Sequence, residues 1–380
     1  MAPIRVGIIG LAGQAAAFAP GRWAAAAHLP PLQQSPNFEI VAIANSTIES
    51  SRKSISFHNL PPTTAAYGSA EDLAKDPNVD LIVVSVRVEK HFELTQAAIK
   101  HRKGVFVEWP LGASLEESEE LTKLAKEAGV KTVVGLQARA GKLASAVKKI
   151  LAEERIGKVI SSHVLANASL LPVDAWWQGY ESYMDMKSGG NGFYIFFGHF
   201  LDSFVNILGD FDALQATLST QWPTVPLLDA TGQVVDPAMP RTVPDHIMVQ
   251  GKLQSGAVAS ISFRHTKSSV DRTSLKWIIS GTEGEIEISL PEEFQSMEAQ
   301  WQVASANLKL RVRLGREDKV EDVDFASELD DVAKELGPTA INTGLVYEAF
   351  ANGNGEVYAT FADALKTHRI LDRIAKAAGL

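Results

Sequence analysis

Cysteine is absent from the 380-residue chain, and its absence removes several kinds of chemistry at once. Without cysteine the protein has no disulfide, no thiolate nucleophile, no iron–sulfur cluster and no cysteine-ligated zinc. Long apolar runs are also missing, since no stretch of 18 consecutive apolar residues occurs, and we expect no membrane partner. Any reaction must therefore use histidine, carboxylate, lysine or tyrosine side chains, or a bound cofactor.

Positive charge is scarce as well. The chain has 36 Lys and Arg residues against 45 Asp and Glu, a net charge of -9, with no basic run. Phosphate backbones require a concentrated basic face, so we expect no direct nucleic-acid partner. The N-terminus shows neither the basic nor the apolar region of a signal peptide, so the expected location is the cytoplasm, or the nucleus if the protein is a regulator.

The first part of the chain alternates short apolar runs with helical stretches. Such β-branched runs are typical of strands buried on both faces, and their alternation with helices is typical of right-handed βαβ units. Ser114, Glu117 and Gly129 mark the start and end of one of these helices. We predict an α/β fold with a doubly wound parallel sheet of Rossmann type in a domain of residues 1–138. The predicted strands are 4–9, 39–44, 81–86, 105–108 and 132–135.

The pattern changes near residue 140 to longer strands with alternating polarity. We predict a second α/β domain, residues 139–380, built on a large, mostly antiparallel open sheet. A helix at 198–208 interrupts the strands, and Thr360 begins a final helix. The segment 223–244 contains five of the 17 prolines and is predicted to be a surface excursion. The expected strands are 156–168, 214–222, 245–253, 257–264, 275–281 and 285–290.

The turn after the first strand predicts a dinucleotide site. Gly10, Leu11, Ala12 and Gly13 stand where a Rossmann fold carries the glycine-rich loop that approaches a pyrophosphate. The match to G-x-G-x-x-G is imperfect, because Ala12 replaces the second glycine. A plain tight turn in another α/β domain is the alternative.

The end of the second predicted strand bears on the choice of cofactor. An NAD site usually has Asp or Glu there, whereas this chain has Asn45 and Ser46, with Arg52 and Lys53 further on. Because no carboxylate occupies the strand end to repel a 2′-phosphate, we expect NADP(H) rather than NAD(H). The alternative is that Arg52 and Lys53 are a solvated helix face and that Asn45 serves NAD equally well.

Motifs along almost the whole chain resemble one enzyme family. The strand and turn 8–10, the block 105–111 and the sequence 198–202 are similar to the Gfo/Idh/MocA family, which includes glucose–fructose oxidoreductase and inositol dehydrogenase. The sequences 281–284 and 360–365 are also similar to it, and 242–246 resembles its galactose-regulon repressor branch. The resemblance implies a Rossmann domain followed by an open sheet that often forms a dimer, so a homodimer is expected. We assign four further residues to the cofactor site: Val86, Glu108, Trp109 and Gln137.

Two positions depart from the dehydrogenases of that family. Trp109 stands where the resemblance places a lysine beside the nicotinamide, and Ile195 stands where it places an aspartate. His199 remains, and imidazole is the side chain best suited to exchange a proton near neutral pH. We therefore predict His199 as the catalytic acid–base, with Tyr194 beside it.

The region before His199 is rich in aromatic residues, and in the family it lines the substrate pocket. Some of these rings are expected to be ordinary core. A pocket of this composition suits a carbonyl, imine or enone of a lipophilic metabolite better than a free sugar. The predicted pocket residues are Trp109, Arg139, Trp177, Tyr180, Tyr194, Phe197 and Asp202. The histidines show no metal-ligand spacing, so no metal is expected.

Three functions remain open at this point. The first is an NADP(H)-dependent oxidoreductase that acts on a small-molecule substrate through His199. The second is a catalytically silent, nucleotide-sensing transcriptional regulator that binds a protein partner, suggested by the changes at Trp109 and Ile195. The third is an isomerase, lyase or pericyclase that holds the cofactor without net turnover.

Overall fold

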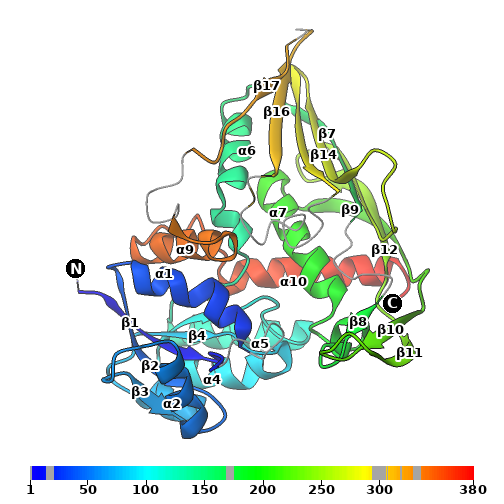
Figure 1. Ribbon diagram of the computed structural model, residues 1–380. Helices are drawn as coiled ribbons and strands as arrows, with labels where there is room; N and C mark the ends of the chain where they lie inside the picture. Colours follow the sequence, from blue (N-terminus) through cyan, green and yellow to red (C-terminus); the bar gives the residue numbers. More distant parts are fainter. Residues whose placement is uncertain are drawn as a thin grey trace. The chain divides into compact units, whose positions relative to one another are not determined.

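The computed structural model describes residues 2–13, 21–167, 175–292, 305, 307–316, 319–327 and 335–380. The chain divides into two compact units (Figure 1). The first consists of Met1–Ala140 and Asp330–His368, and the second of Gly141–Leu329 and Arg369–Leu380. The predicted domains, 1–138 and 139–380, had placed the segment from Asp330 onward in the second domain.

The first unit contains a six-stranded sheet in which every pairing is parallel. This confirms the predicted doubly wound fold. All four residues of β4 are buried, as a strand covered on both faces requires. The edge strand β3 was not predicted, because its three residues carry no apolar pattern. The order is β3 (Ala65–Tyr67), β2 (Phe38–Ala44), β1 (Ile4–Ile9), β4 (Leu81–Val84), β5 (Gly104–Val107), β6 (Thr132–Val134).

Helices connect these strands, and the one among them whose ends were predicted begins and ends where expected. In α5 (Leu115–Ala128), Ser114 Oγ accepts from Glu117 N at 3.2 Å, and Gly129 ends the helix with a φ of 67°. The Glu117 carboxylate accepts from Ala113 N at 2.8 Å, so the reciprocal bond of the predicted capping box lies one residue earlier. The other helices of this part are η1 (Ala24–His28), α1 (Leu29–Gln34), α2 (Ile48–Phe57), α3 (Ala70–Lys75), η2 (Val88–Lys90), α4 (His91–Lys100) and η3 (Gln137–Ala140).

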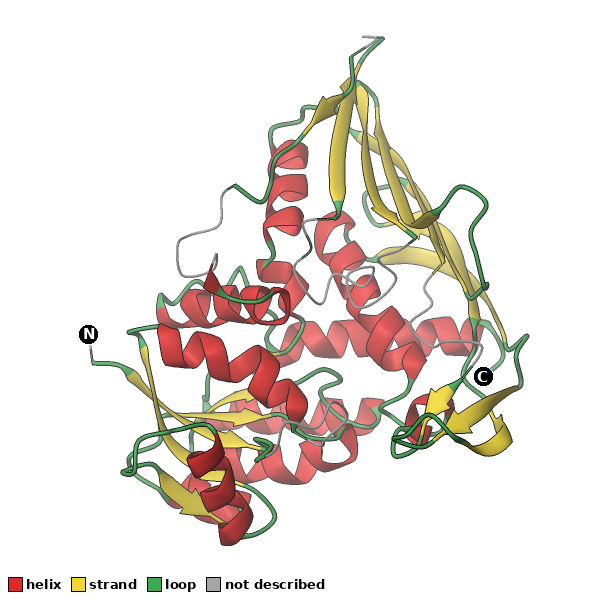
Figure 2. Cartoon of the chain, viewed as in Figure 1, coloured by secondary structure: helices red, strands yellow, loops and turns green. Residues whose placement is uncertain are grey.

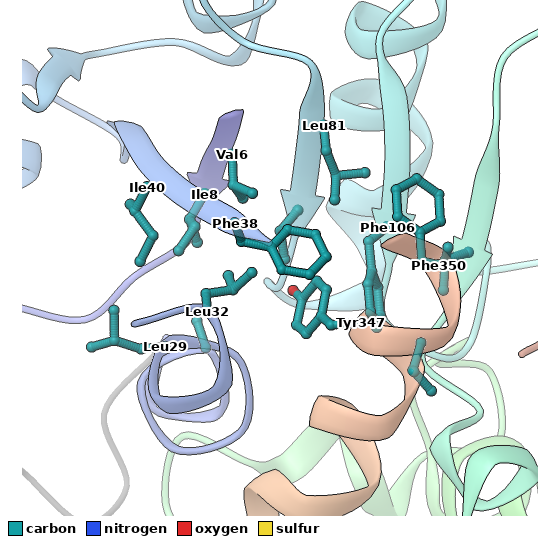
Figure 3. Close-up of a cluster of buried hydrophobic side chains, with 14 of the residues drawn as sticks. Val6, Ile8, Leu29, Leu32, Phe38, Ile40, Leu81, Phe106, Tyr347 and Phe350 are labelled. Carbon is teal, nitrogen blue, oxygen red and sulfur yellow. The ribbon is translucent and has the colours of Figure 1, made fainter. Parts of the chain in front are cut away.

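A helix from near the C-terminus completes the core of the first unit. In α9 (Pro338–Ala351), Val346, Tyr347 and Phe350 pack among side chains of β1, β2 and β5 (Figure 3). The orange helix α9 lies beside the blue α1 in Figure 1. Burial of these large apolar side chains explains why the segment belongs to the first unit rather than to the second, where the sequence prediction put it.

The second unit contains an eight-stranded sheet that confirms the predicted mostly antiparallel architecture. Its only parallel pair among the described strands is β7 with β13. Helix α7 (Gly198–Leu208) lies along one face (Figure 2), with Phe200 and Phe204 against Trp277 at ring-centroid distances of 5.5 and 5.4 Å. The order is β17 (Glu321–Asp322), β16 (Lys309–Leu314), β15 (Gly284–Pro291), β14 (Thr273–Gly281), β7 (Val159–Asn167), β13 (Val258–Arg264), β12 (His246–Leu253), β9 (Phe211–Ser219).

The proline-rich segment 223–244 contains strands that were not predicted. β10 (Thr224–Leu228) pairs with β11 (Val234–Pro240) and with β8 (Trp176–Trp177) in a small separate sheet. Pro226 and Pro237 have no partner in the β10–β11 register, so their missing N–H groups interrupt no ladder hydrogen bond. Prolines in a sequence argue against a strand, and the unpaired positions that make these two compatible with one are not visible in the sequence. The remaining helices are α6 (Lys142–Ala152), η4 (Glu181–Met184), η5 (Phe193–Phe197) and α10 (Phe361–Ala377), of which α10 begins in the first unit and ends in the second.

Candidate functional site

The glycine turn lies at the carboxyl edge of the first sheet, between β1 and the neighbouring β4. Gly10 has a φ of 96°, and a Cβ atom there would lie 2.4 Å from Ser85 O and 2.5 Å from Val86 Cγ1. Only glycine fits this position, because any Cβ atom there would clash with the loop after β4. The strand order changes direction between β1 and β4, which is where open α/β sheets bind nucleotides.

Side chains from the end of β2 and from α2 hold the turn from the other side. Asn45 Nδ2 donates to Leu11 O at 3.1 Å, and Ser54 Oγ donates to the same oxygen at 2.7 Å. His58 Nε2 lies 2.7 Å from Ala12 O. Sequence reasoning named Asn45 but missed Ser54 and His58, although their i, i+4 spacing places both on one helical face. The Asn45 amide therefore has a role in fixing the loop.

The other predicted cofactor-selecting residues follow β2 or lie on α2. Ser46 and Arg52 are exposed, the latter on α2. Thr47 caps α2 through a reciprocal pair of bonds with Ser50, which fixes the N-terminus of the helix beside the loop. At Gly13 a Cβ atom would lie 3.1 Å from Ser54 N, so this part of the turn also runs close to the helix.

A buried polar cluster lies behind the end of β5. His28 is 0% exposed; its Nε2 is 2.6 Å from Glu108 Oε1 and its Nδ1 is 2.7 Å from the Tyr347 hydroxyl. Burial, followed by the charge of Glu108, holds the pKa of Tyr347 well above its ordinary value. A neutral phenol that donates to Nδ1, with Nε2–H donating to Glu108, satisfies all three groups. Neither His28 nor Tyr347 was predicted from the sequence, because neither belongs to a recognisable motif.

Gln137 joins this cluster from the start of η3, the short helix after β6. Its Nε2 donates to both carboxylate oxygens of Glu108, at 3.2 and 3.1 Å. Its Oε1 is buried and accepts no hydrogen bond from the described residues. A buried acceptor without a donor is costly, so this oxygen fits the amide or hydroxyl donor of a bound nucleotide. Together with the Gly10 turn, it makes the carboxyl edge of this sheet a fitting site for a dinucleotide cofactor.

His91 ties two loops of the same edge together. Its Nε2 lies 3.1 Å from Val86 O, and its Nδ1 lies 2.7 Å from Pro110 O. The side chain is buried, and this burial lowers the pKa of His91. The predicted residues Val86 and Trp109 are thus positioned by a histidine that sequence reasoning missed.

Trp109 and Arg139 make contacts within the first unit. The Trp109 indole is 4% exposed and lies on the His368 imidazole, with 4.5 Å between ring centroids. Burial lowers the pKa of His368 to about 3, so this imidazole is neutral. Arg139 Nη1 lies 3.6 Å from Asp363 Oδ1. Burial alone would raise the pKa of Asp363, but hydrogen bonds from Thr360 and the charge of Arg139 outweigh it and lower that pKa.

The predicted acid–base residues belong to the second unit, around an irregular helix start. A π-helical turn, η5, includes Tyr194 and leads directly into α7, whose second residue is His199. Such turns occur frequently at functional sites. Asn191, buried at 0% exposure, accepts from Phe193 N and Tyr194 N at 2.9 and 3.1 Å and so fixes the start of this turn. His199 is 1% exposed, and Tyr194 is half-buried.

The remaining predicted pocket residues fall into two groups. Phe197 is core, with its ring 5.7 Å from that of Phe193 and 5.3 Å from that of Phe263, and Asp202 is also buried, at 1% exposure. Trp177 and Tyr180 are half-buried and belong to a ring cluster next to β8.

Two features are absent from the described residues. Within the described ranges, no group of three or more His, Cys, Asp or Glu side chains is arranged to hold a metal ion. No helix of the described chain is long and apolar enough to cross a membrane.

The parallel sheet and the Gly10 turn at the point where the strand order reverses define a protein with a Rossmann fold of the dinucleotide-binding type. Residues 4–136 match the family model described as "Oxidoreductase family, NAD-binding Rossmann fold", and residues 144–289 match "Gal80p, C-terminal domain". The chain belongs to the Gfo/Idh/MocA oxidoreductase family, and the predicted likeness to its galactose-regulon repressor branch is confirmed.

Both regulators and a dehydrogenase are among the similar proteins. The galactose/lactose metabolism regulatory protein GAL80 of Kluyveromyces lactis is 33% identical over 304 residues, which are 75% of this chain and 64% of that protein. Its namesake from Saccharomyces cerevisiae is 32% identical over 76% of this chain and 67% of its own length. The dehydrogenase aclE of Aspergillus oryzae is 28% identical over 99% of this chain and 96% of its own.

The solved structures agree with this placement. The transcriptional regulator Gal80p from Kluyveromyces lactis superposes with a TM-score of 0.81 at 28% identity, over 99% of this chain and 92% of that one.

Proposed function

We propose that the protein is an NAD(P)(H)-dependent oxidoreductase that acts on a carbonyl, imine or alcohol carbon of a small or lipophilic metabolite. The observation that carries this proposal is the Gly10 turn, whose backbone lies against the loop after β4 at the point where the strand order reverses. When bound, the nicotinamide cofactor supplies or accepts the hydride. In this proposal Gln137 Oε1 accepts a hydrogen bond from the nucleotide.

The proton in this reaction is assigned to His199, with Tyr194 as a second donor. Positioned acid–base assistance typically contributes 10² to 10⁴-fold to a rate, so one histidine is sufficient to support turnover without the family lysine. The His368 imidazole under Trp109 is neutral and buried, and we assign it to holding the indole in place.

Cofactor binding and turnover test the proposal separately. Saturation with NADPH at about 100 Kd should stabilise the protein by about 2.7 kcal/mol in thermal unfolding. A screen of aldehydes, ketones, imines and alcohols, followed at the absorbance band of the reduced nicotinamide, should then find turnover, and His199→Asn should lower kcat about 10²-fold or more. Absence of stabilisation by either nucleotide would contradict the proposal.

Preference for NADP(H) over NAD(H) rests on the exposed Arg52 and on the absence of a carboxylate at the end of β2. Loss of one charge-assisted hydrogen bond to a 2′-phosphate lowers the affinity for the nucleotide about tenfold. We expect NADPH to bind more tightly than NADH and Arg52→Ala to reduce that difference about tenfold. The exposed Lys123 on α5 gives the control, Lys123→Ala, which should leave the ratio unchanged. Tighter binding of NADH to the unaltered protein would contradict the preference.

A catalytically silent regulator is the second candidate, favoured by the similarity to two regulatory proteins and by Trp109 at the lysine position. In that case the second unit binds a protein partner and the nucleotide shifts the population that binds it. Tight nucleotide binding without turnover across the substrate screen would favour this candidate, especially if an acidic activator peptide binds with an affinity that depends on nucleotide.

We also propose a homodimer formed through the large sheet. Four apolar side chains on β7, β12 and β13 are exposed, namely Ile160, Leu165, Met248 and Val258. Large exposed apolar side chains on a sheet are candidates for a protein interaction site. Light scattering should give a dimer mass of about twice the 41.0 kDa of the chain, and Met248→Glu should shift the equilibrium toward monomer. A monomer at every concentration would contradict this proposal.

A further inference from the structure

Arg241 lies directly after β11 and is buried, with 2% of its surface exposed. Its Nε donates to Val243 O at 3.3 Å, but Nη1 and Nη2 donate to no residue of the described chain. A guanidinium stays charged in proteins, and a buried charge without hydrogen-bond partners is strongly disfavoured. Two donors of a rigid planar fork are therefore buried without an acceptor in the described chain.

Asp245 balances the charge of Arg241 without using these donors. Its Oδ1 accepts from Gln221 N at 2.9 Å and lies 2.7 Å from His246 Nδ1, while its Oδ2 accepts from Trp222 N at 2.8 Å. Burial lowers the pKa of Arg241, and the charge of Asp245 opposes that effect. Because both oxygens of Asp245 are already hydrogen-bonded, it stabilises the cation from a distance and leaves its Nη groups to another acceptor.

The backbone beside Arg241 is attached to an aromatic segment. Thr242 N and Val243 N both donate to Met184 O, at 2.9 and 3.2 Å, at the end of η4. The rings around η4 contact one another: centroid distances are 5.4 Å for Trp176–Trp177, 5.8 Å for Trp176–Tyr183 and 5.7 Å for Tyr183–Phe196. The backbone that follows Arg241 is therefore hydrogen-bonded to the segment that carries this cluster of aromatic side chains.

A short hydrogen-bonded path connects the same segment to the predicted acid–base residues. Met186 N donates to Thr242 Oγ1 at 2.8 Å, and Asn191 Nδ2 donates to Met186 O at 3.1 Å. Asn191 Oδ1 in turn accepts from Tyr194 N, in the π-helical turn that leads to His199. The backbone next to Arg241 is thus linked to that of Tyr194 by hydrogen bonds through the exposed Thr242, the half-buried Met186 and the buried Asn191.

We propose that Arg241 binds a carboxylate, so that the substrates of this protein are carboxylic acids with an aromatic or aliphatic body. The inference rests on the proposed function, since it names the substrate class of that enzyme. A carboxylate matches the two Nη donors in a bidentate arrangement, which a lysine cannot reproduce. The aromatic cluster of η4 and β8 suits the apolar body of such an acid.

Binding of model acids tests the proposal without requiring turnover. The probes are phenylacetate and hexanoate, each compared with its neutral amide by titration calorimetry on the full chain saturated with NADPH. We expect at least one acid to bind and its amide to bind at least tenfold more weakly. Arg241→Met should weaken binding of the acid by about thirtyfold or more, because a buried charged partner is lost. Arg241→Lys should give an intermediate loss, since it keeps the charge but not the fork.

Controls separate this site from a general charge effect. Arg316→Met removes an exposed arginine of the same unit and should leave binding of both acids unchanged. Circular dichroism and NADPH binding show whether each variant is folded. The proposal is overturned if neither acid binds, if acid and amide bind equally, if both Arg241 variants bind the acid as the unaltered protein does, or if phenyl phosphate binds and the carboxylates do not. Turnover of neutral substrates only would refute this inference alone, whereas acid binding without any hydride transfer would refute only the proposed reaction.

Discussion

In the first unit, the His28 imidazole has a partner on each ring nitrogen, and Glu108 is held by His28 from η1 and Gln137 from η3. In the second unit, the two Nη groups of Arg241 have no acceptor among the described residues. Both sites bury charge at similarly low exposure. The difference is that the His28 and Glu108 groups are paired within the fold, whereas the Nη groups of Arg241 have no acceptor among the described residues. The first cluster therefore supports structure, and the second indicates a binding site.

Removal of the charge from Glu108 should have the largest effect. In Glu108→Gln, the new amide N–H₂ faces donors from His28 or Gln137, and the loss of a buried charged partner costs about 3–5 kcal/mol of unfolding free energy. Urea unfolding measures this loss. Glu127→Gln, at an exposed position on α5, is the matched control and should change stability by less than about 0.5 kcal/mol. An equal effect of the two variants would show that the cluster contributes nothing to stability.

The sequence located the strand ends at this edge of the sheet, including Glu108 and Gln137, but not the helical residues His28 and Tyr347. Strands of a parallel sheet end at one edge, so the strand ends that carry Gly10, Asn45, Glu108 and Gln137 had to lie together once the apolar runs were recognised. His28 and Tyr347 depend instead on which helices pack against the sheet, and nothing local to α9 indicates that it joins the first core. The strands β10 and β11 were missed for another reason. Their prolines contradict a strand pattern unless the bulges in the ladder are known.

The pH dependence of stability should reveal the buried His368 in the same unit. Its folded pKa of about 3 lies below the ordinary value near 6.5, so between these values only the unfolded chain binds the proton. Stability is therefore unaffected above about pH 6.5 and falls as the pH decreases from there toward 3, by about 1.4 kcal/mol per pH unit for one proton.

Urea unfolding at pH 7, 6 and 5 tests this assignment. His368→Phe, which keeps a ring against Trp109, should remove that part of the slope. The exposed His163 offers the comparison, and His163→Asn should leave the slope as it is. A slope that survives in His368→Phe would assign the proton to other groups.

The Gly10 turn allows backbone strain to be separated from close approach. In Gly10→Ala, the left-handed φ and the contact with Ser85 O should together cost about 1–3 kcal/mol and displace the loop, with at least a tenfold loss of NADPH affinity. Gly353 has a φ of 69° with nothing within 4 Å of the added Cβ, so Gly353→Ala carries the strain alone. Calorimetric titration with NADPH distinguishes them: unchanged affinity in Gly10→Ala would remove this turn from the cofactor site.

The smallest effect is expected at Arg241, and its small size is the informative result. Arg373 in the same unit donates to Phe211 O at 2.9 Å and to Asp210 at 3.3 Å, so Arg373→Met should cost about 1.5–3 kcal/mol in urea unfolding without ligand. Arg241→Met removes a cation whose Nη groups have no partner in the described chain, and methionine fills similar space, so stability should change by less than about 1 kcal/mol or increase. A loss of 3 kcal/mol or more would mean that the attraction to Asp245 holds the fold together, and Arg241 would then belong with the Glu108 cluster as a structural charge. A neutral or stabilising result would mean that the arginine is retained at the expense of the unliganded protein, which is the pattern expected of a group that serves a ligand.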